Sequence, residues 1–139
     1  MIKMTDKTDN LKMVAESQIC ALSHNASDGL TYYKSAQEYV LGTDVHSSLE
    51  QLNRTITVLA EYADACQIPY IRIDDYAFFH KFMLAEIKLF PSKYSIGFMS
   101  KKGKFLAYIT LEDKKGYEDF CQYIMKNLAE LPEEISISL

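Results

Sequence analysis

The chain has 139 residues, 48% of them hydrophobic and 24% charged, with a formal net charge of −4. These values are typical of one globular domain, exclude a disordered chain, and argue against a general nucleic-acid binder. No window approaches 18 apolar residues and residues 1–10 lack the apolar core of a signal peptide, so we expect a cytoplasmic protein.

The first 42 residues predict a mobile lead-in and two helices. We expect residues 1–8 to be mobile and residues 9–139 to form a single domain. Asp9 can cap a helix with five apolar residues on one face, and Thr31 can open a second helix that stops at Gly42. The apolar residues of the first face are Leu11, Val14, Ala15, Ile19 and Leu22.

Residues 45–66 carry the clearest helical pattern, because their apolar side chains recur at alternating steps of four and three. These residues are Val45, Leu49, Leu52, Ile56, Leu59, Ala63 and Cys66. Asp44, Ser47 and Ser48 can each cap this helix, and spacing alone does not choose between them. We expect the helix to be central to the domain core. A homodimer through a coiled-coil seam is the alternative.

The segment after Pro69 has mixed signals. Residues 70–73 alternate and are β-branched, which predicts a short strand. Residues 75–90 are apolar on nearly every side, so periodicity does not separate a buried helix from a buried strand. Their length favours a helix.

The last third of the chain predicts a hairpin over residues 94–111, with Gly103 in the turn. Gly97 within the first strand indicates a bulge or a close backbone approach. A last helix is expected over residues 117–131, followed by an edge strand over residues 135–139. The fold class is therefore predicted to be α+β. We expect four to five helices around the long one, with a small, mainly antiparallel sheet.

Motifs that name a reaction are missing from the sequence. The five glycines are isolated, so no phosphate-binding glycine motif is present, and the three cysteines fit no metal or redox spacing. Asp74, Asp75 and His80 are the only candidates for a catalytic role, and they are weak ones because helix capping and core packing explain them better. We expect no metal and no cofactor, and we lean against an enzyme.

The charge distribution singles out the predicted hairpin. Residues 93–115 contain six lysines and two acidic residues, a net charge of +4, which leaves −8 for the rest of the chain. Protection of a strand edge explains such lysines, and so does a contact with an acidic or phosphorylated ligand. The candidate binding residues are Lys101, Lys102 and Lys104 of this turn, together with Tyr32, Tyr33 and Tyr62.

These observations favour a non-enzymatic module that binds another protein, of the inhibitor, immunity, adaptor or phage anti-defence type. The alternative is a domain that binds or sequesters a small phosphorylated, nucleotide-like ligand through the lysines and tyrosines. A small metal- or acid–base-dependent enzyme comes third.

Overall fold

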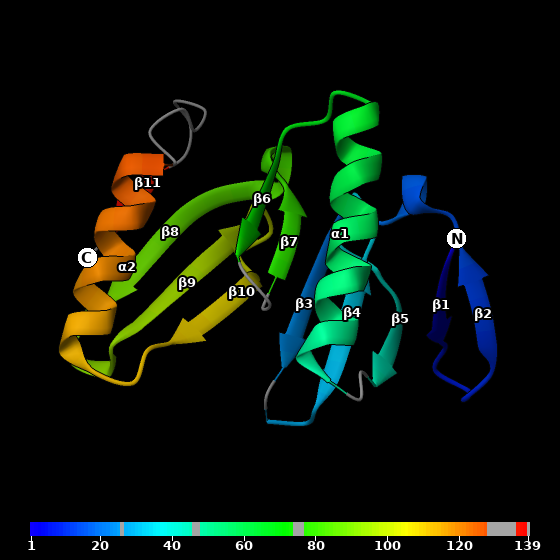
Figure 1. The fold of residues 1–139 in the computed structure, drawn as a ribbon, viewed down its shortest axis with the longest axis horizontal. Helices are drawn as coiled ribbons and strands as arrows, with labels where there is room; N and C mark the ends of the chain where they lie inside the picture. Colours follow the sequence, from blue (N-terminus) through cyan, green and yellow to red (C-terminus); the bar gives the residue numbers. More distant parts are fainter. Residues whose placement is uncertain (26, 46–47, 74–76, 128–135, 139) are drawn as a thin grey trace. The chain divides into compact units, whose positions relative to one another are not determined.

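The structure is a computed structural model that describes the chain except residues 26, 46–47, 74–76, 128–135 and 139 (Figure 1). Its residues form two compact units, Met1–Met83 and Leu84–Leu139. Each unit is described by itself below.

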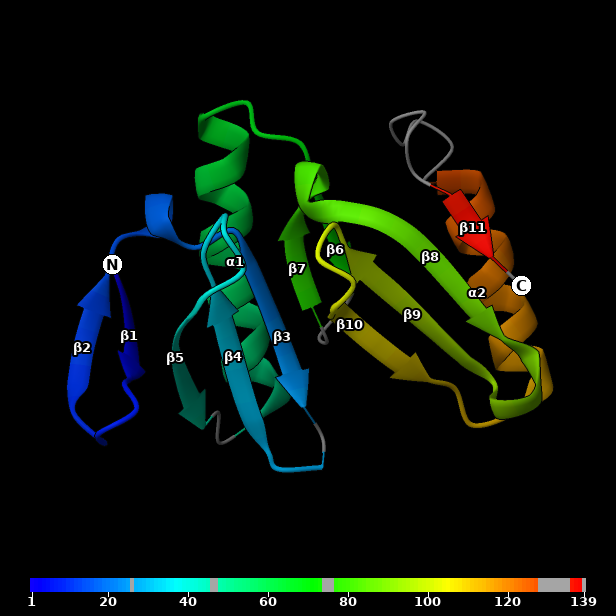
Figure 2. The ribbon, with the colours of Figure 1, turned by 180° about the vertical axis from the view of Figure 1, so that it is seen from behind.

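The first unit is built on a seven-stranded antiparallel sheet with the strand order β2-β1-β5-β4-β3-β7-β6. The strands are β1 (Ile2–Thr5), β2 (Leu11–Val14), β3 (Ala21–Asn25), β4 (Leu30–Lys34), β5 (Val40–Val45), β6 (Tyr70–Ile73) and β7 (Ala77–His80). Short 3-10 turns lie at Glu16–Gln18 and at Lys81–Met83. Figure 2 looks onto strands β3, β4 and β5, with the helix of this unit behind them.

Helix α1 (Leu49–Ala65) forms within the segment predicted to be the long helix. Ser48 is its N-cap, because the Ser48 hydroxyl accepts a hydrogen bond from the Gln51 backbone N–H at 3.2 Å. The capping residue that spacing left open is thus identified. The helix ends at Ala65, with Cys66 as its C-cap, close before Pro69.

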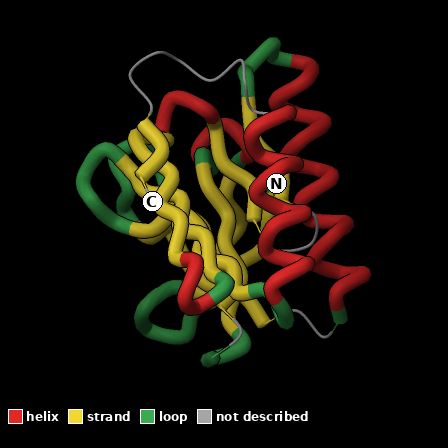
Figure 3. Tube along the Cα trace, turned by 90° about the vertical axis from the view of Figure 1, so that its left-hand side faces the viewer, coloured by secondary structure: helices red, strands yellow, loops and turns green. Residues whose placement is uncertain are grey.

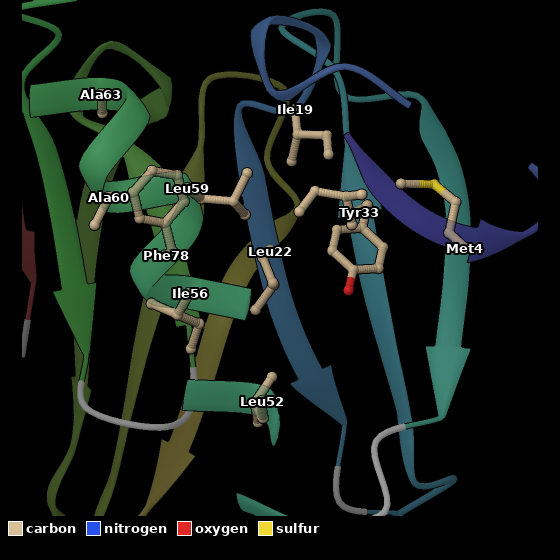
Figure 4. Close-up of a cluster of buried hydrophobic side chains, with 11 residues drawn as sticks. Met4, Ile19, Leu22, Tyr33, Leu52, Ile56, Leu59, Ala60, Ala63 and Phe78 are labelled. Carbon is tan, nitrogen blue, oxygen red and sulfur yellow. The ribbon is translucent and has the colours of Figure 1, made fainter. Parts of the chain in front are cut away.

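The middle of the apolar stripe of α1 is buried in the core of its own unit, whereas Leu49 at its start and Cys66 at its end are exposed. Five of its side chains pack in one cluster with side chains from β1, β3, β4 and β7 (Figure 4). The helical members of this cluster are Leu52, Ile56, Leu59, Ala60 and Ala63. This part of the stripe is therefore covered by the sheet. The alternative of a homodimer through the helix of residues 45–66 is wrong, since a seam would need these side chains at the surface.

The helix predicted to begin at Asp9 is wrong, because these residues form a β-hairpin. The Asp6 carboxylate accepts hydrogen bonds from the backbone N–H groups of Thr8 and Asn10, at 2.8 and 3.0 Å. Asp9 has a φ of 62°, in the left-handed region that turns use. Strand β1 thus pairs with β2, and the five residues that matched a helical face are distributed over β2, β3 and the connection between them.

The second helix, predicted from Thr31 to Gly42, is also wrong. Strands β4 and β5 pair there across a turn in which Glu38 has a φ of 67°. Thr31 and Tyr33 of β4 are both completely buried, whereas the residues between and beside them are half-buried. That alternation has the period of a strand, and the β-propensity of threonine and tyrosine supports it.

The second unit is a four-stranded sheet with the order β10-β9-β8-β11 and one helix. Its elements are β8 (Leu84–Phe90), β9 (Ser95–Ser100), β10 (Phe105–Thr110), α2 (Lys114–Asn127) and β11 (Ser136–Ser138), with a 3-10 turn at Pro91–Lys93. Strand β11 is parallel to β8, and the other pairs are antiparallel. The expected hairpin is present as β9 and β10.

Helix α2 lies along one face of this sheet. It is drawn in front of β8 in Figure 1 and behind it in Figure 2, and Figure 3 shows the helical turns to one side of the strands. Two of its side chains, Tyr117 and Ile124, are buried. Within the described residues of this unit, no helix lies on the other face of the sheet.

The helix favoured for residues 75–90 is wrong as well. Its described part forms β7, the 3-10 turn at Lys81–Met83 and β8. Strand β8 pairs with β9 over most of its length, so the backbone groups of this apolar run are satisfied between strands. Asp74 and Asp75, the expected caps, lie outside the described residues.

The predicted fold class is therefore wrong in its balance of elements. The described residues contain two α-helices and are mostly β-structure in two sheets, in place of four to five helices around a central one. In the part of the chain that the structure describes, no helix has the length and hydropathy needed to cross a membrane.

Replacing Ile56 by alanine tests the core of the first unit. Ile56 is fully buried, so Ile56→Ala is expected to lower the free energy of unfolding by about 2–5 kcal/mol. Urea unfolding followed by circular dichroism measures this loss. The control is Glu50→Ala, which removes an exposed carboxylate paired with Arg54 and is expected to cost less than about 0.5 kcal/mol. Equal midpoints for the two variants would contradict the packing of α1 described above.

Candidate functional site

The register of the second sheet sorts its side chains onto two faces. Directly opposite residues of paired strands share a face, so Ile87 lies beside Phe98, Leu89 beside Ile96, and Ile96 beside Ile109. All five of these apolar side chains are buried. We infer that they form the face that α2 covers.

The opposite face carries aromatic rings. Lys88 lies opposite Gly97 on β9, and Gly97 lies opposite Tyr108 on β10. Phe90 is two residues after Lys88 on β8, so it lies on the same face. Phe105 pairs with Met99, which is two residues after Gly97 on β9, so Phe105 lies on this face as well. The rings of Phe90, Tyr108 and Phe105 therefore form one continuous group across three strands, called the aromatic strip from here on.

The rings of the aromatic strip contact one another and remain open to solvent. The centroids of Phe90 and Tyr108 are 5.9 Å apart, and those of Phe105 and Tyr108 are 5.2 Å apart in an edge-to-face arrangement. Phe105 and Tyr108 are each 45% exposed, and Phe90 is half-buried. Burial of apolar area is favourable, so two neighbouring rings that stay exposed offer apolar surface that a binding partner could cover.

Gly97 lies directly beneath this strip. A Cβ atom at Gly97 would stand 2.5 Å from Cε1 of Phe105 and 3.5 Å from Cε2 of Phe90. The first distance is too short for any side chain, so the Phe105 ring covers the β9 backbone only because residue 97 is glycine. The close approach predicted at Gly97 is found here, and the bulge lies in β10, between Phe105 and Ala107.

Lysines stand at both ends of the strip. The ammonium nitrogen of Lys93, just before β9, is 6.0 Å from the centroid of the Phe90 ring, within range of a cation–π contact. At the other end, Lys101, Lys102 and Lys104 are exposed in the turn between β9 and β10. Gly103 has a φ of 77° and closes this turn with a hydrogen bond to Ser100. The arrangement places cations beyond each end of an apolar, π-rich surface.

One ion pair lies on the same face. The ammonium group of Lys88 is 3.8 Å from the carboxylate of Glu86, and both side chains are partly exposed. Since the pair is neutral as a unit, Lys88 adds little to the positive charge around the rings.

The predicted binding residues fall in different units. Lys101, Lys102 and Lys104 lie at the strip, whereas the three tyrosines belong to the first unit. The hydroxyl of Tyr32 donates to Asp28, which raises its pKa. Tyr33 is wholly buried in the core, and burial raises the pKa of its phenol. Tyr62 is half-buried on α1, where a hydrogen bond with Cys66 raises its pKa.

The weak catalytic candidates are not brought into a site by the described residues. Asp74 and Asp75 lie outside them. His80 is buried on β7, with the rings of Phe78 and Phe82 at 5.6 and 5.7 Å. Burial lowers its pKa, because desolvation disfavours the charged imidazolium. Among the described His, Cys, Asp and Glu residues, no group of three is placed to hold a metal ion.

Sequence reasoning missed the aromatic strip and Lys93. Phe105 and Tyr108 are three residues apart, so strict strand alternation assigns them to opposite faces. The bulge between Phe105 and Ala107 inserts one residue and returns both rings to the same face. The signal available in the sequence was Gly97, because a strand glycine often lies under a neighbouring ring.

Comparisons with known proteins were made for the whole chain. No family model and no curated protein matched. A solved structure, the LytTr DNA-binding domain of a response regulator from Bacillus cereus, is similar over 88% of this chain and 94% of its own, with a TM-score of 0.45 and 15% identity. At these values the likeness carries no argument about which residues bind or what they bind.

The predicted function does not agree with this neighbour and is withdrawn. The neighbour is named as a DNA-binding domain, and the predicted inhibitor, immunity, adaptor or anti-defence function does not agree with it. The predictions that another protein is the expected partner and that nucleic acid is not expected do not agree with this neighbour either. These predictions, with the small phosphorylated ligand that accompanied them, are not carried forward.

A double-mutant cycle tests the contact between Gly97 and Phe105. Gly97→Ala alone is expected to lower the free energy of unfolding by about 1 kcal/mol, because the Phe105 ring must move off β9. In a Phe105→Ala background the same change is expected to be neutral or stabilising, since it then removes only backbone freedom of the unfolded chain. The coupling energy should exceed about 0.5 kcal/mol in denaturant titrations. Additive effects would show that the ring does not lie over Gly97.

Proposed function

We propose that the chain binds nucleic acid, without catalysing a reaction, through the aromatic strip and the lysines at its two ends. One observation carries the proposal: half-exposed rings on an open sheet face are bordered by Lys93 at one end and by Lys101, Lys102 and Lys104 at the other. Nucleic acids complement such a face, because their phosphates can pair with the lysines and their bases can stack on the rings.

The positive charge near the aromatic strip allows binding to nucleic acid although the whole chain is acidic. The segment of residues 93–115 has a net charge of +4, although the whole chain has −4. Phosphate contacts act over roughly one Debye length, about 8 Å at physiological ionic strength, so the nearby lysines dominate over distant acidic residues. Lysine contacts with phosphates supply affinity and position the ligand without reading its sequence.

Edge protection explains only part of the arrangement. Strand β10 is an edge strand of its sheet, and lysines beside it would discourage pairing with another chain. Edge protection gives no reason for Phe105 and Tyr108 to be exposed on the sheet face, where polar side chains would be better solvated. Binding accounts for both the lysines and the rings. Such a role is consistent with the cytoplasmic location expected from the sequence.

Replacing Lys101, Lys102 and Lys104 together by glutamine tests the phosphate contacts. The triple variant is expected to bind a fluorescently labelled oligonucleotide more weakly, and the slope of log K against log salt should become shallower by about 2–3. Fluorescence anisotropy at several salt concentrations measures both quantities. The fold should be retained, because exposed substitutions usually cost little stability.

The matched control removes the same charge elsewhere. Replacing Lys3, Lys7 and Lys12 of the first unit by glutamine also changes the net charge by three, and it leaves the strip untouched. This variant is expected to bind nearly like the parent chain. If the two triple variants lose affinity equally, only overall charge matters and the proposed interface is wrong. Absence of binding by the parent chain would contradict the function itself.

A further inference from the structure

We infer, resting on the proposed function, that the ligand is single-stranded and that its bases stack on the rings of Tyr108 and Phe105. The inference starts from what the rings offer. A ring that is 45% exposed on a sheet face presents part of its π-surface to solvent, and a base can cover this surface only when its own face is free. In a duplex the base faces are covered by neighbouring base pairs, so a duplex presents edges and phosphates to a protein.

The geometry of the strip favours separate bases over a stacked duplex. The rings of Phe105 and Tyr108 are inclined by 76° to each other, with centroids 5.2 Å apart. Two bases that cover these rings must be inclined in the same way, which requires a strand whose bases are splayed apart. Splayed, unstacked bases on aromatic side chains are a mode of recognition found with single strands, and sheet faces with two or three aromatic residues support it.

The position of the lysines matches a strand that crosses the face. Strand β9 has six residues, so Lys93 and Lys101 are separated by a strand length of about 20 Å along the sheet. Phosphates of a short single strand can meet cations at both ends while the bases between them lie over the rings. The path follows β9 and β10, over the rings that cover Gly97.

Sequence preference should be weak at this surface. Stacking tolerates every base, because every base has a π-face, and lysine contacts with phosphates carry no sequence information. Within the strip itself, the hydroxyl of Tyr108 is the one polar group that the three rings carry. The ligand class is therefore a single strand of DNA or RNA, bound with little dependence on its sequence.

The test compares single-stranded and duplex ligands on the full chain. An oligothymidylate of about 12 nucleotides, within the range bound by known sheet-based modules, is titrated beside a self-complementary hairpin duplex of similar total charge. The parent chain is expected to bind the single strand more tightly. Tyr108→Ala is expected to weaken binding of the single strand by at least about tenfold and to leave duplex binding nearly unchanged. Tyr108→Phe, which keeps the ring, should bind like the parent chain.

A second exposed tyrosine provides the matched control. Tyr123 is 51% exposed on α2, away from the sheet face that carries the strip. Tyr123→Ala therefore removes an exposed ring of the same kind and is expected to leave single-strand affinity unchanged. Circular dichroism of each variant verifies that a loss of binding does not come from unfolding.

The outcomes separate this inference from the proposed function. If the duplex binds as tightly as the single strand, or if Tyr108→Ala binds both like the parent chain, stacking is overturned. In that case a loss of affinity in the triple lysine variant would still support nucleic-acid binding. If neither ligand binds the parent chain, the proposed function fails and the stacking inference fails with it.

Discussion

The aromatic strip depends on the absence of a side chain at residue 97. A single methyl group there would lie 2.5 Å from the Phe105 ring, so any other residue would push that ring away from β9. Glycine in a strand weakens the strand, because it costs backbone entropy and contributes no packing. The Phe105 ring compensates by covering the exposed backbone, and it contacts Tyr108 in turn. One small residue thus permits a continuous group of rings on the face opposite α2.

The sequence predicted secondary structure correctly where a long, continuous hydrophobic pattern was present. It failed where pairing between strands distant in sequence determines the structure. The helix of residues 45–66 has an unbroken period, and α1 forms within it. Residues 9–22 also fit a helical period. There, the Asp6 turn and the pairing of β1 with β2 prevail, because apolar residues spaced by three or four can also lie on short strands separated by turns. Strand pairing joins segments that are distant in sequence, so a short stretch of sequence does not show which strands will pair.

The sequence predicted the lysines of the candidate site and did not predict its aromatic strip. The local sequence pattern predicts a turn at Gly103, and a turn places its flanking residues in solvent. The exposure of Lys101, Lys102 and Lys104 therefore follows from local pattern alone. Grouping Phe90, Tyr108 and Phe105 requires the register of three strands and a bulge that reverses the alternation of β10. Tyr33 shows the opposite error: an aromatic residue that suggested a surface contact is completely buried in the core of the first unit.

Ultraviolet cross-linking tests the central claim most directly, because a base stacked on an aromatic ring forms a covalent adduct with it on irradiation. The full chain is irradiated with an oligothymidylate, digested, and the modified peptides are sequenced by mass spectrometry. The account predicts adducts on Tyr108 and Phe105, with none on Tyr123 of α2. Adducts confined to the residues of the first unit, Met1–Met83, would contradict it.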